Sequence, residues 1–194
     1  MRWRLREATN AAHERLHGHD GFAAAATGEI SRSDYVDLLA RLYGFHRPFE
    51  RAARAVDAFD LAGRGRSGMI AADLAAFGVG AQGLPLCDDM RIDGGEPGLL
   101  GALYVVEGSA LGGVPIARAL ERRYAQDQRR FFLGYGERQG AMWRELVARL
   151  ETLAGAEAAQ DAAITAAVGT FARFEEWMRG WRGAVGPVSS ASRP

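Results

Sequence analysis

Two histidines near the amino terminus of this 194-residue chain have the spacing of a ligand site. His13 and His17 lie four residues apart in a segment with helical periodicity, so their imidazoles share one helix face. Thr9 lies one turn before His13, and Arg6 lies two turns before it on the same side. The spacing predicts an imidazole that binds a metal and a guanidinium that pairs with an anionic group of the same ligand.

The same residues match H-E-x-x-H, the signature of zinc proteases, with Glu14 in the place of the residue that activates water. Three features disfavour this interpretation. Arg15 is charged where that family has uncharged residues, no third zinc ligand follows at a familiar distance, and no sheet precedes the motif to hold a peptide.

A second segment, residues 103–113, reads as a helix although it contains Gly108, Gly112 and Gly113. Each glycine inside a helix costs about 1 kcal/mol relative to alanine, so such a cluster is expected to serve a purpose. Gly108 and Gly112 are four residues apart and open the same face. We expect a flat ligand to lie against that face.

Aromatic and basic residues supply further candidates. The helical spacing of Phe171, Phe174, Trp177 and Trp181 is typical of a core, and Phe174 is the member we expect at a ligand pocket. Basic residues and a tyrosine gather around the loop before a later helix, and one or two of them are candidates to face the same pocket. They are Arg129, Arg130, Tyr135, Arg138 and Arg144.

Helical periodicity dominates the chain and predicts a single all-α domain over residues 1–185, followed by a disordered tail at 186–194. The expected helices run from Leu5 to near Gly18, from Ser31 past a kink or break at Pro48, over 69–77, from Pro97 to about Tyr124, over Gly140–Leu153 and over Asp161–Trp181. Residues 78–96 read as an irregular connection. We expect a bend where the glycine cluster and Pro115 interrupt the central helix.

Composition excludes several classes. Hydrophobic residues make up 48% of the chain, and 24 basic residues balance 24 acidic ones, so neither disorder nor a nucleic-acid-binding protein is indicated. All the basic residues are arginines, which makes guanidinium the cation available for an anionic ligand. Cys87 is the only cysteine, and neither a membrane span nor a signal peptide is recognisable. These features predict a cytoplasmic protein.

Taken together, these segments resemble the haem oxygenase family, in particular its bacterial biliverdin-producing branch, which is often associated with phytochromes. Residues 5–16 look like the family's proximal helix, with its axial histidine at His13. Residues 100–113 look like its distal helix, and residues 66–78 and 170–177 are similar too. The resemblance covers residues 3–182. It implies a haem-oxygenase-like helical bundle with a kinked, glycine-rich distal helix.

The resemblance also implies a set of site residues. His13 would bind the iron, and Gly108, Ser109 and Gly112 would form the distal, catalytic side. Ser109 stands where mammalian-type members carry an aspartate that orders distal water. The residues expected to contact haem are Arg6, Thr9, Tyr104, Gly108, Gly112, Arg138, Arg144 and Phe174.

By the same resemblance, haem is both substrate and cofactor, and O₂ and external electrons convert it to biliverdin, CO and iron. The implied partners are a separate reductase or ferredoxin and a bacteriophytochrome as biliverdin acceptor. One alternative is a haem-binding carrier or sensor of the same fold without turnover. Another is a thiamine-degrading or quinone-cofactor-forming relative, which would need a catalytic cysteine or carboxylate in the pocket, and Cys87 lies in a predicted loop.

Overall fold

Apolar residues repeating at helical spacing produce a bundle of helices in the computed structural model, which describes residues 1–185. The α-helices are α1 (Arg2–His17), α2 (Asp20–Thr27), α3 (Arg32–Val56), α4 (Ser67–Ala76), α5 (Gly95–Leu120), α6 (Arg130–Leu133), α7 (Gln139–Glu151) and α8 (Glu157–Met178). Two short 3₁₀ turns lie at Gln126–Gln128 and Gly136–Arg138. No strand occurs in this range, so the all-α prediction is confirmed. The predicted tail at 186–194 lies outside the described residues.

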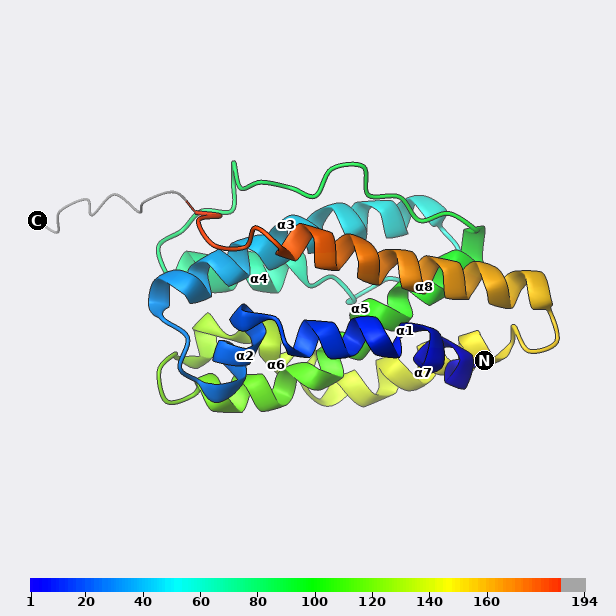
Figure 1. Cartoon of the computed structure of the whole chain (residues 1–194), viewed down its shortest axis with the longest axis horizontal. Coiled ribbons are helices and arrows are strands. Elements are labelled where there is room, and N and C mark those ends of the chain that lie inside the picture. Colours follow the sequence, from blue (N-terminus) through cyan, green and yellow to red (C-terminus); the bar gives the residue numbers. More distant parts are fainter. Residues whose placement is uncertain (186–194) are drawn as a thin grey trace, which may run out of the picture.

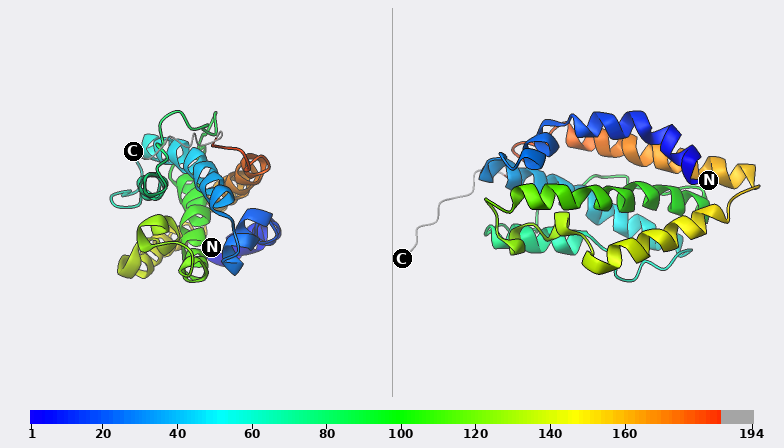
Figure 2. Two further views of the ribbon diagram at one scale, coloured as in Figure 1. Left: turned by 90° about the vertical axis from the view of Figure 1, so that its left-hand side faces the viewer. Right: turned by 90° about the horizontal axis from the view of Figure 1, so that it is seen from below.

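Helix α5 is the centre of the bundle (Figures 1 and 2). It packs against α8, α7, α2, α6 and α3, while α1 packs mainly against α8. By length and composition alone, α5 could cross a membrane, but half of its most apolar stretch is buried inside the bundle. It therefore has the surroundings of a core helix.

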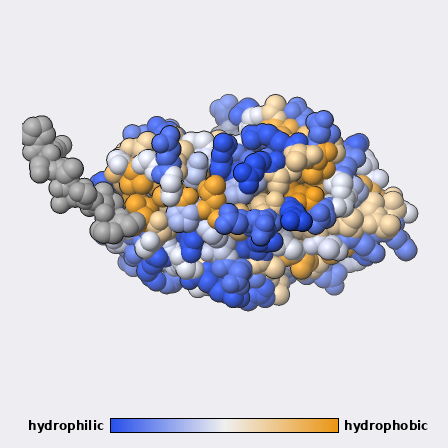
Figure 3. Space-filling model, turned by 90° about the horizontal axis from the view of Figure 1, so that it is seen from above, coloured by the Kyte–Doolittle hydropathy of each residue, from blue (hydrophilic) through white to orange (hydrophobic). Residues whose placement is uncertain are grey.

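The apolar interior falls into two clusters. One joins α3 and α4 to α6 and the end of α5, and the other joins α1, α7 and α8 to the first half of α5. Phe174 and Trp177 of α8 pack against both clusters and connect them. Seen from above, the face formed by α3, α8 and the connection after α4 is largely hydrophilic, with apolar residues in separate groups (Figure 3).

Helix α2 was not expected, and it ends at Gly28, whose φ of 73° is the left-handed conformation that glycine adopts at helix ends. Helix α5 is continuous, as predicted, and neither the glycines nor Pro115 divide it. The predicted start of α3 is confirmed, because the Asp34 backbone N–H donates to the Ser31 hydroxyl at 3.1 Å.

Pro48 does not divide α3 either. Proline has no N–H, so the carbonyl of Gly44 loses its usual partner one turn away. The backbone N–H of Cys87, in the connection between α4 and α5, donates to this carbonyl at 2.8 Å. The close approach requires glycine, since a Cβ at position 44 would overlap the Pro85 carbonyl and lie 2.5 Å from the Trp177 ring. A distant loop thus completes the helix.

Candidate active site

His13 presents an accessible imidazole on α1. Its side chain is 56% exposed, and its ring lies edge-on to that of His17 with the centroids 4.5 Å apart. The ring of Phe171, on α8, gives the imidazole an apolar neighbour, with the two ring centroids 6.5 Å apart. The Glu14 carboxylate is the nearest charged group, 3.7 Å from His13 Nδ1, which is too far for a hydrogen bond.

The zinc-protease interpretation, which the sequence already disfavours, gains no support from the structure. Among residues 1–185, no group of three or more histidine, cysteine or acidic side chains is arranged to hold a metal ion. A catalytic zinc site needs three protein ligands and an open position. His13, Glu14 and His17 do not make such a set.

Arg6 and Tyr104 link α1 to the central helix. Tyr104 is half-buried on α5, 5.5 Å from the Trp143 ring of α7 between centroids. Burial raises the pKa of its phenol, and the guanidinium groups of Arg2 and Arg6 oppose that rise, so both cations lie on this side of α5. Arg6 is exposed and forms no ion pair among the described residues, which leaves it available to an anionic ligand.

Thr9 has a different environment from the one predicted. Its side chain is buried, and its hydroxyl donates to the Leu5 carbonyl at 2.7 Å. Threonine commonly bonds back to the preceding helical turn in this way. The hydroxyl is therefore committed within α1, and only the methyl group of Thr9 could contribute to a ligand site.

The glycines of α5 divide into two kinds. A Cβ at Gly112 would meet no atom within 4 Å, and one at Gly108 would meet only the Trp143 ring, at 3.6 Å. By contrast, a Cβ at Gly113 would lie 2.8 Å from the carbonyl oxygen of Phe132 on α6. Packing therefore explains Gly113, whereas Gly108 and Gly112 leave an open strip of backbone. Leu111, 41% exposed, borders that strip.

Ser109 is exposed beside this strip, but its hydroxyl is engaged within the protein. Its hydroxyl donates to the Val106 carbonyl at 2.7 Å and accepts from Arg66 Nη1 at 3.4 Å. Arg66 is 1% exposed, and its Nη2 donates to the Phe131 carbonyl at 2.8 Å. The Ser109 proton is thus already used, and the residue can serve further water as an acceptor.

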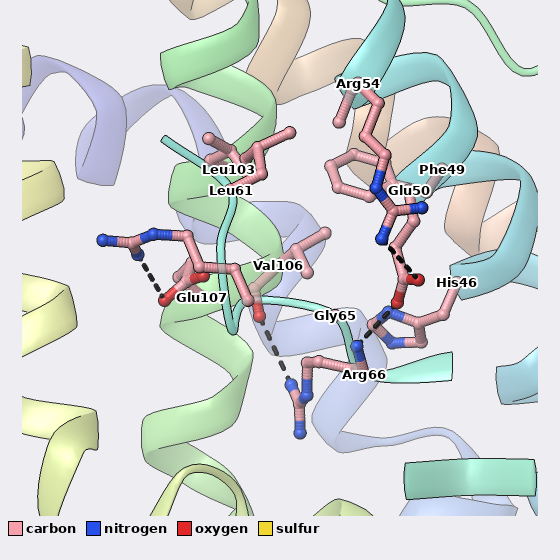
Figure 4. A pocket seen from close by; sticks show the side chains of 12 residues that line it. His46, Phe49, Glu50, Arg54, Leu61, Gly65, Arg66, Leu103, Val106 and Glu107 are labelled. Carbon is pink, nitrogen blue, oxygen red and sulfur yellow. Dashed lines mark hydrogen bonds and ion pairs between the residues drawn. The ribbon is translucent and has the colours of Figure 1, made fainter. Parts of the chain in front are cut away.

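Arg66 belongs to a buried polar layer behind α5 that sequence reasoning did not find (Figure 4). Arg64 pairs there with Glu107 at 3.2 Å, and both side chains are less than 5% exposed. Burial raises the pKa of Glu107, and Arg64 opposes that rise. Glu50 accepts from the backbone N–H groups of Arg66 and Ser67 at 2.6 and 2.7 Å, which fixes the start of α4.

His46, on α3, is the neutral member of this layer. Burial lowers the pKa of its imidazole, and the neighbouring Arg66 lowers it further. Its Nδ1 and the Arg66 Nε are buried without a partner among the described residues. The small cavity between α3 and α5 is lined by both side chains. A solitary acid such as Glu107 within an apolar helix was the sequence signal that could have revealed this layer.

The remaining residues predicted to contact haem have different surroundings from one another. Arg138 lies against Gly63, in the loop between α3 and α4, and forms no hydrogen bond with α1 or α5 in the described chain. Arg144 is exposed on α7, one residue from Trp143. Phe174 is half-buried and packs edge-on to Phe45 with centroids 4.8 Å apart, so it is chiefly a core residue.

The two described cavities are lined by residues other than those predicted for the ligand. One lies behind α5, and the other is bordered by α4, α6 and the adjoining turns. His13 and Gly112 instead lie on surfaces open to solvent. The structure thus leaves three of the predicted features exposed: the imidazole of His13 and the guanidinium of Arg6 on α1, and the backbone at Gly112 on α5.

Comparison with known proteins defines the class. A family model described as Heme oxygenase matches residues 1–79 and 84–180. The haem oxygenase of Neisseria meningitidis, solved with NO and CO bound, has a similar structure: the TM-score is 0.75 and the identity 21%, over 98% of this chain and 97% of that chain. No curated protein matches.

The chain therefore belongs to the haem oxygenase family. Its fold and its enzyme class, an oxidoreductase acting on haem, agree with the expectation from the resemblance.

Proposed function

We propose that this protein binds haem between α1 and α5, with His13 as the iron ligand, and converts it to biliverdin, CO and iron. The observation that carries the site assignment is the accessible imidazole of His13, 56% exposed on the helix that the family match covers. A histidine is the usual proximal ligand of a haem that reacts with O₂. Haem is the substrate as well as the group that activates oxygen.

The residues of the two helices fit a flat, dianionic disc. Gly112 offers a face where even a methyl group would meet nothing within 4 Å, which suits a porphyrin and a small gas above it. Phe171 supplies an apolar wall beside His13. Arg6 supplies the charge that the propionates need, since guanidinium pairs well with carboxylate.

Each chain residue then has a limited task. His13 would hold the iron through its exposed imidazole. Gly108 and Gly112 leave room for O₂ and water and add no acidic or basic side chain. Ser109 accepts a hydrogen bond beside Arg66. Arg6, with Arg144 as a second candidate, orients the disc and so selects the carbon that is cleaved.

The reaction also defines partners. This chain shows no flavin or iron–sulfur motif, so a separate reductase or ferredoxin supplies the electrons. A bacteriophytochrome is the acceptor expected from the branch that the sequence resembles. The chain has one cysteine, Cys87, which suits a reducing compartment, so we propose a cytoplasmic location.

The ligand assignment is tested by His13→Ala. We expect loss of the histidine-ligated haem spectrum, and partial recovery on adding imidazole, because the free base can fill the space left by the side chain. His17→Ala is the matched control and should keep the spectrum. An unchanged spectrum and activity in His13→Ala would rule out the assignment.

Turnover is tested with the ferric haem complex and either ascorbate or a ferredoxin with its reductase. In air, with catalase present, the Soret band should disappear as biliverdin absorption grows in the red, and added myoglobin should trap CO. Catalase excludes uncontrolled degradation by free peroxide. Haem that binds one-to-one and survives reduction in air would instead identify a carrier.

A further inference from the structure

His17 has no task in the proposed haem site, yet it is built into the same surface as His13. Both residues are exposed on α1, one helical turn apart, and their ring centroids are 4.5 Å apart. Within residues 1–185 neither imidazole forms a hydrogen bond; the nearest polar contact is the 3.7 Å approach of Glu14 to His13. Two unengaged imidazoles therefore face the solvent side by side.

This arrangement has the dimensions of a metal chelate. Zinc–nitrogen bonds of about 2.0–2.1 Å and a tetrahedral angle place the centres of two coordinated imidazoles roughly 5 Å apart. The observed centroid distance of 4.5 Å is close to that spacing. The chain has already fixed the helix that carries both ligands, which reduces the entropic cost of binding.

The local electrostatics favour a cation. His17 is the last residue of α1, and the aligned peptide dipoles of a helix give its carboxyl end a partial negative charge. Glu14 adds a formal negative charge 3.7 Å from His13 Nδ1. Neutral imidazole prefers zinc, nickel and copper to the hard cations magnesium and calcium.

We propose that, in the protein without haem, His13 and His17 together bind a divalent late transition-metal ion. Water fills the remaining positions, because no third protein ligand is arranged nearby among residues 1–185. The ion is therefore exchangeable, unlike a structural zinc. If His13 is also the haem ligand, as proposed above, the metal and haem compete for the same imidazole, and metal availability sets how readily the protein loads with haem.

The binding test is calorimetric titration of Zn²⁺ into the full, haem-free chain, without a polyhistidine tag and in a buffer that does not chelate metals. We expect one site, and a loss of affinity of about tenfold or more in both His13→Ala and His17→Ala, because each leaves a single imidazole. Adding Asn10→His to His17→Ala recreates a pair one turn apart and should recover affinity. Wild-type affinity in His17→Ala would overturn the proposal.

The competition test measures hemin affinity with and without Zn²⁺. At a free Zn²⁺ concentration ten times its dissociation constant, the apparent hemin dissociation constant should rise about tenfold in the wild type. It should rise far less in His17→Ala, which keeps His13. Unchanged hemin affinity in zinc-saturated wild-type protein would overturn competition. A normal haem spectrum in His13→Ala would refute the haem ligand and leave the zinc titration as an independent result.

Discussion

Two regions on the same face of α5 use glycine for opposite purposes. Gly101 and Gly112 are about three helical turns apart, so both residues point the same way from the helix axis. A Cβ at Gly101 would overlap the backbone carbonyl of Ala163, so the absence of a side chain lets α5 and α8 cross closely. A Cβ at Gly112 would meet no atom within 4 Å. The buried ion pair of Arg64 and Glu107 lies elsewhere around the helix, whereas Gly112 is exposed.

This contrast separates stability from function within one helix. Close packing compensates the helix-propensity cost of Gly101, but nothing in the described structure compensates that of Gly112. A residue that lowers stability without a packing reason is a candidate for a ligand site. Substitutions of closely packed residues should therefore change stability, and substitution of Gly112 should change chemistry.

The largest effect is expected at the buried charge. Arg64→Met leaves Glu107 buried without its cation, and removing one partner of a buried pair typically destabilises a protein by about 3–5 kcal/mol. Urea unfolding followed by circular dichroism measures the loss. Arg122→Met, at an exposed position, is the control and should change stability by about 0.5 kcal/mol or less. Equal stability of the two variants would show that the ion pair of Arg64 and Glu107 does not stabilise the fold.

The next largest loss of stability is expected for Gly101→Ala. The methyl group gains about 1 kcal/mol of helix propensity, but it must displace the α8 backbone at Ala163, and overpacking costs typically 1–3 kcal/mol and occasionally more. We expect a net loss of about 2 kcal/mol in the free energy of unfolding. A variant as stable as the wild type would mean that α5 and α8 can separate freely at this point.

Asp73, buried on α4, gives the stability of the interior a pH dependence. Its two oxygens accept from the Arg130 and Phe131 backbone N–H groups at the start of α6, both at 2.9 Å, and burial raises its pKa to about 6. As pH rises from about 4 to 6, the unfolded chain loses this proton before the folded protein does, so Asp73 contributes less stability at pH 6 than at pH 4.

The test of this effect compares the wild type with Asp73→Asn. The variant cannot titrate, so the stability difference between the two proteins should shrink by about 2 kcal/mol from pH 4 to pH 6.5. Urea unfolding at several pH values measures it. A difference that stays constant over this range would contradict the raised pKa.

The smallest change in stability, and the most selective, is expected at Gly112→Ala. With no atom within 4 Å of the new methyl group, the variant should gain up to about 1 kcal/mol. It should nevertheless form biliverdin more slowly, because the methyl group occupies space meant for O₂ or water. Single-turnover spectra measure this alongside unfolding. Full turnover would place the ligand face elsewhere on α5.

The long helices were predictable from sequence, because α1, α5 and α8 have many apolar residues at helical spacing. Helix α2 could not be predicted from periodicity, because half of its eight residues are alanine and it shows no polar face. Asp20 at its start and Gly28 at its end were the available signals. The helical segments between residues 126 and 138 are each too short to show a repeating pattern of apolar residues.

The site was only partly predictable. Sequence spacing selected His13 and Gly112, and both are exposed, while their roles remain predictions. Spacing could not show that the Thr9 hydroxyl bonds to Leu5 or that Arg138 lies over Gly63. The polar layer behind α5 escaped notice because its residues come from separate helices and loops, and only folding brings them together.

The hydrogen bond from Cys87 to Gly44 means that α3 is not a self-sufficient unit. A peptide of residues 32–56 would be broken at Pro48, with the Gly44 carbonyl left to water, and its full length becomes favourable only after a segment some forty residues later has docked. Helix α3 is thus complete only where the connection after α4 is in place. Cutting or shortening the connection after α4 would weaken a helix that it does not adjoin in sequence.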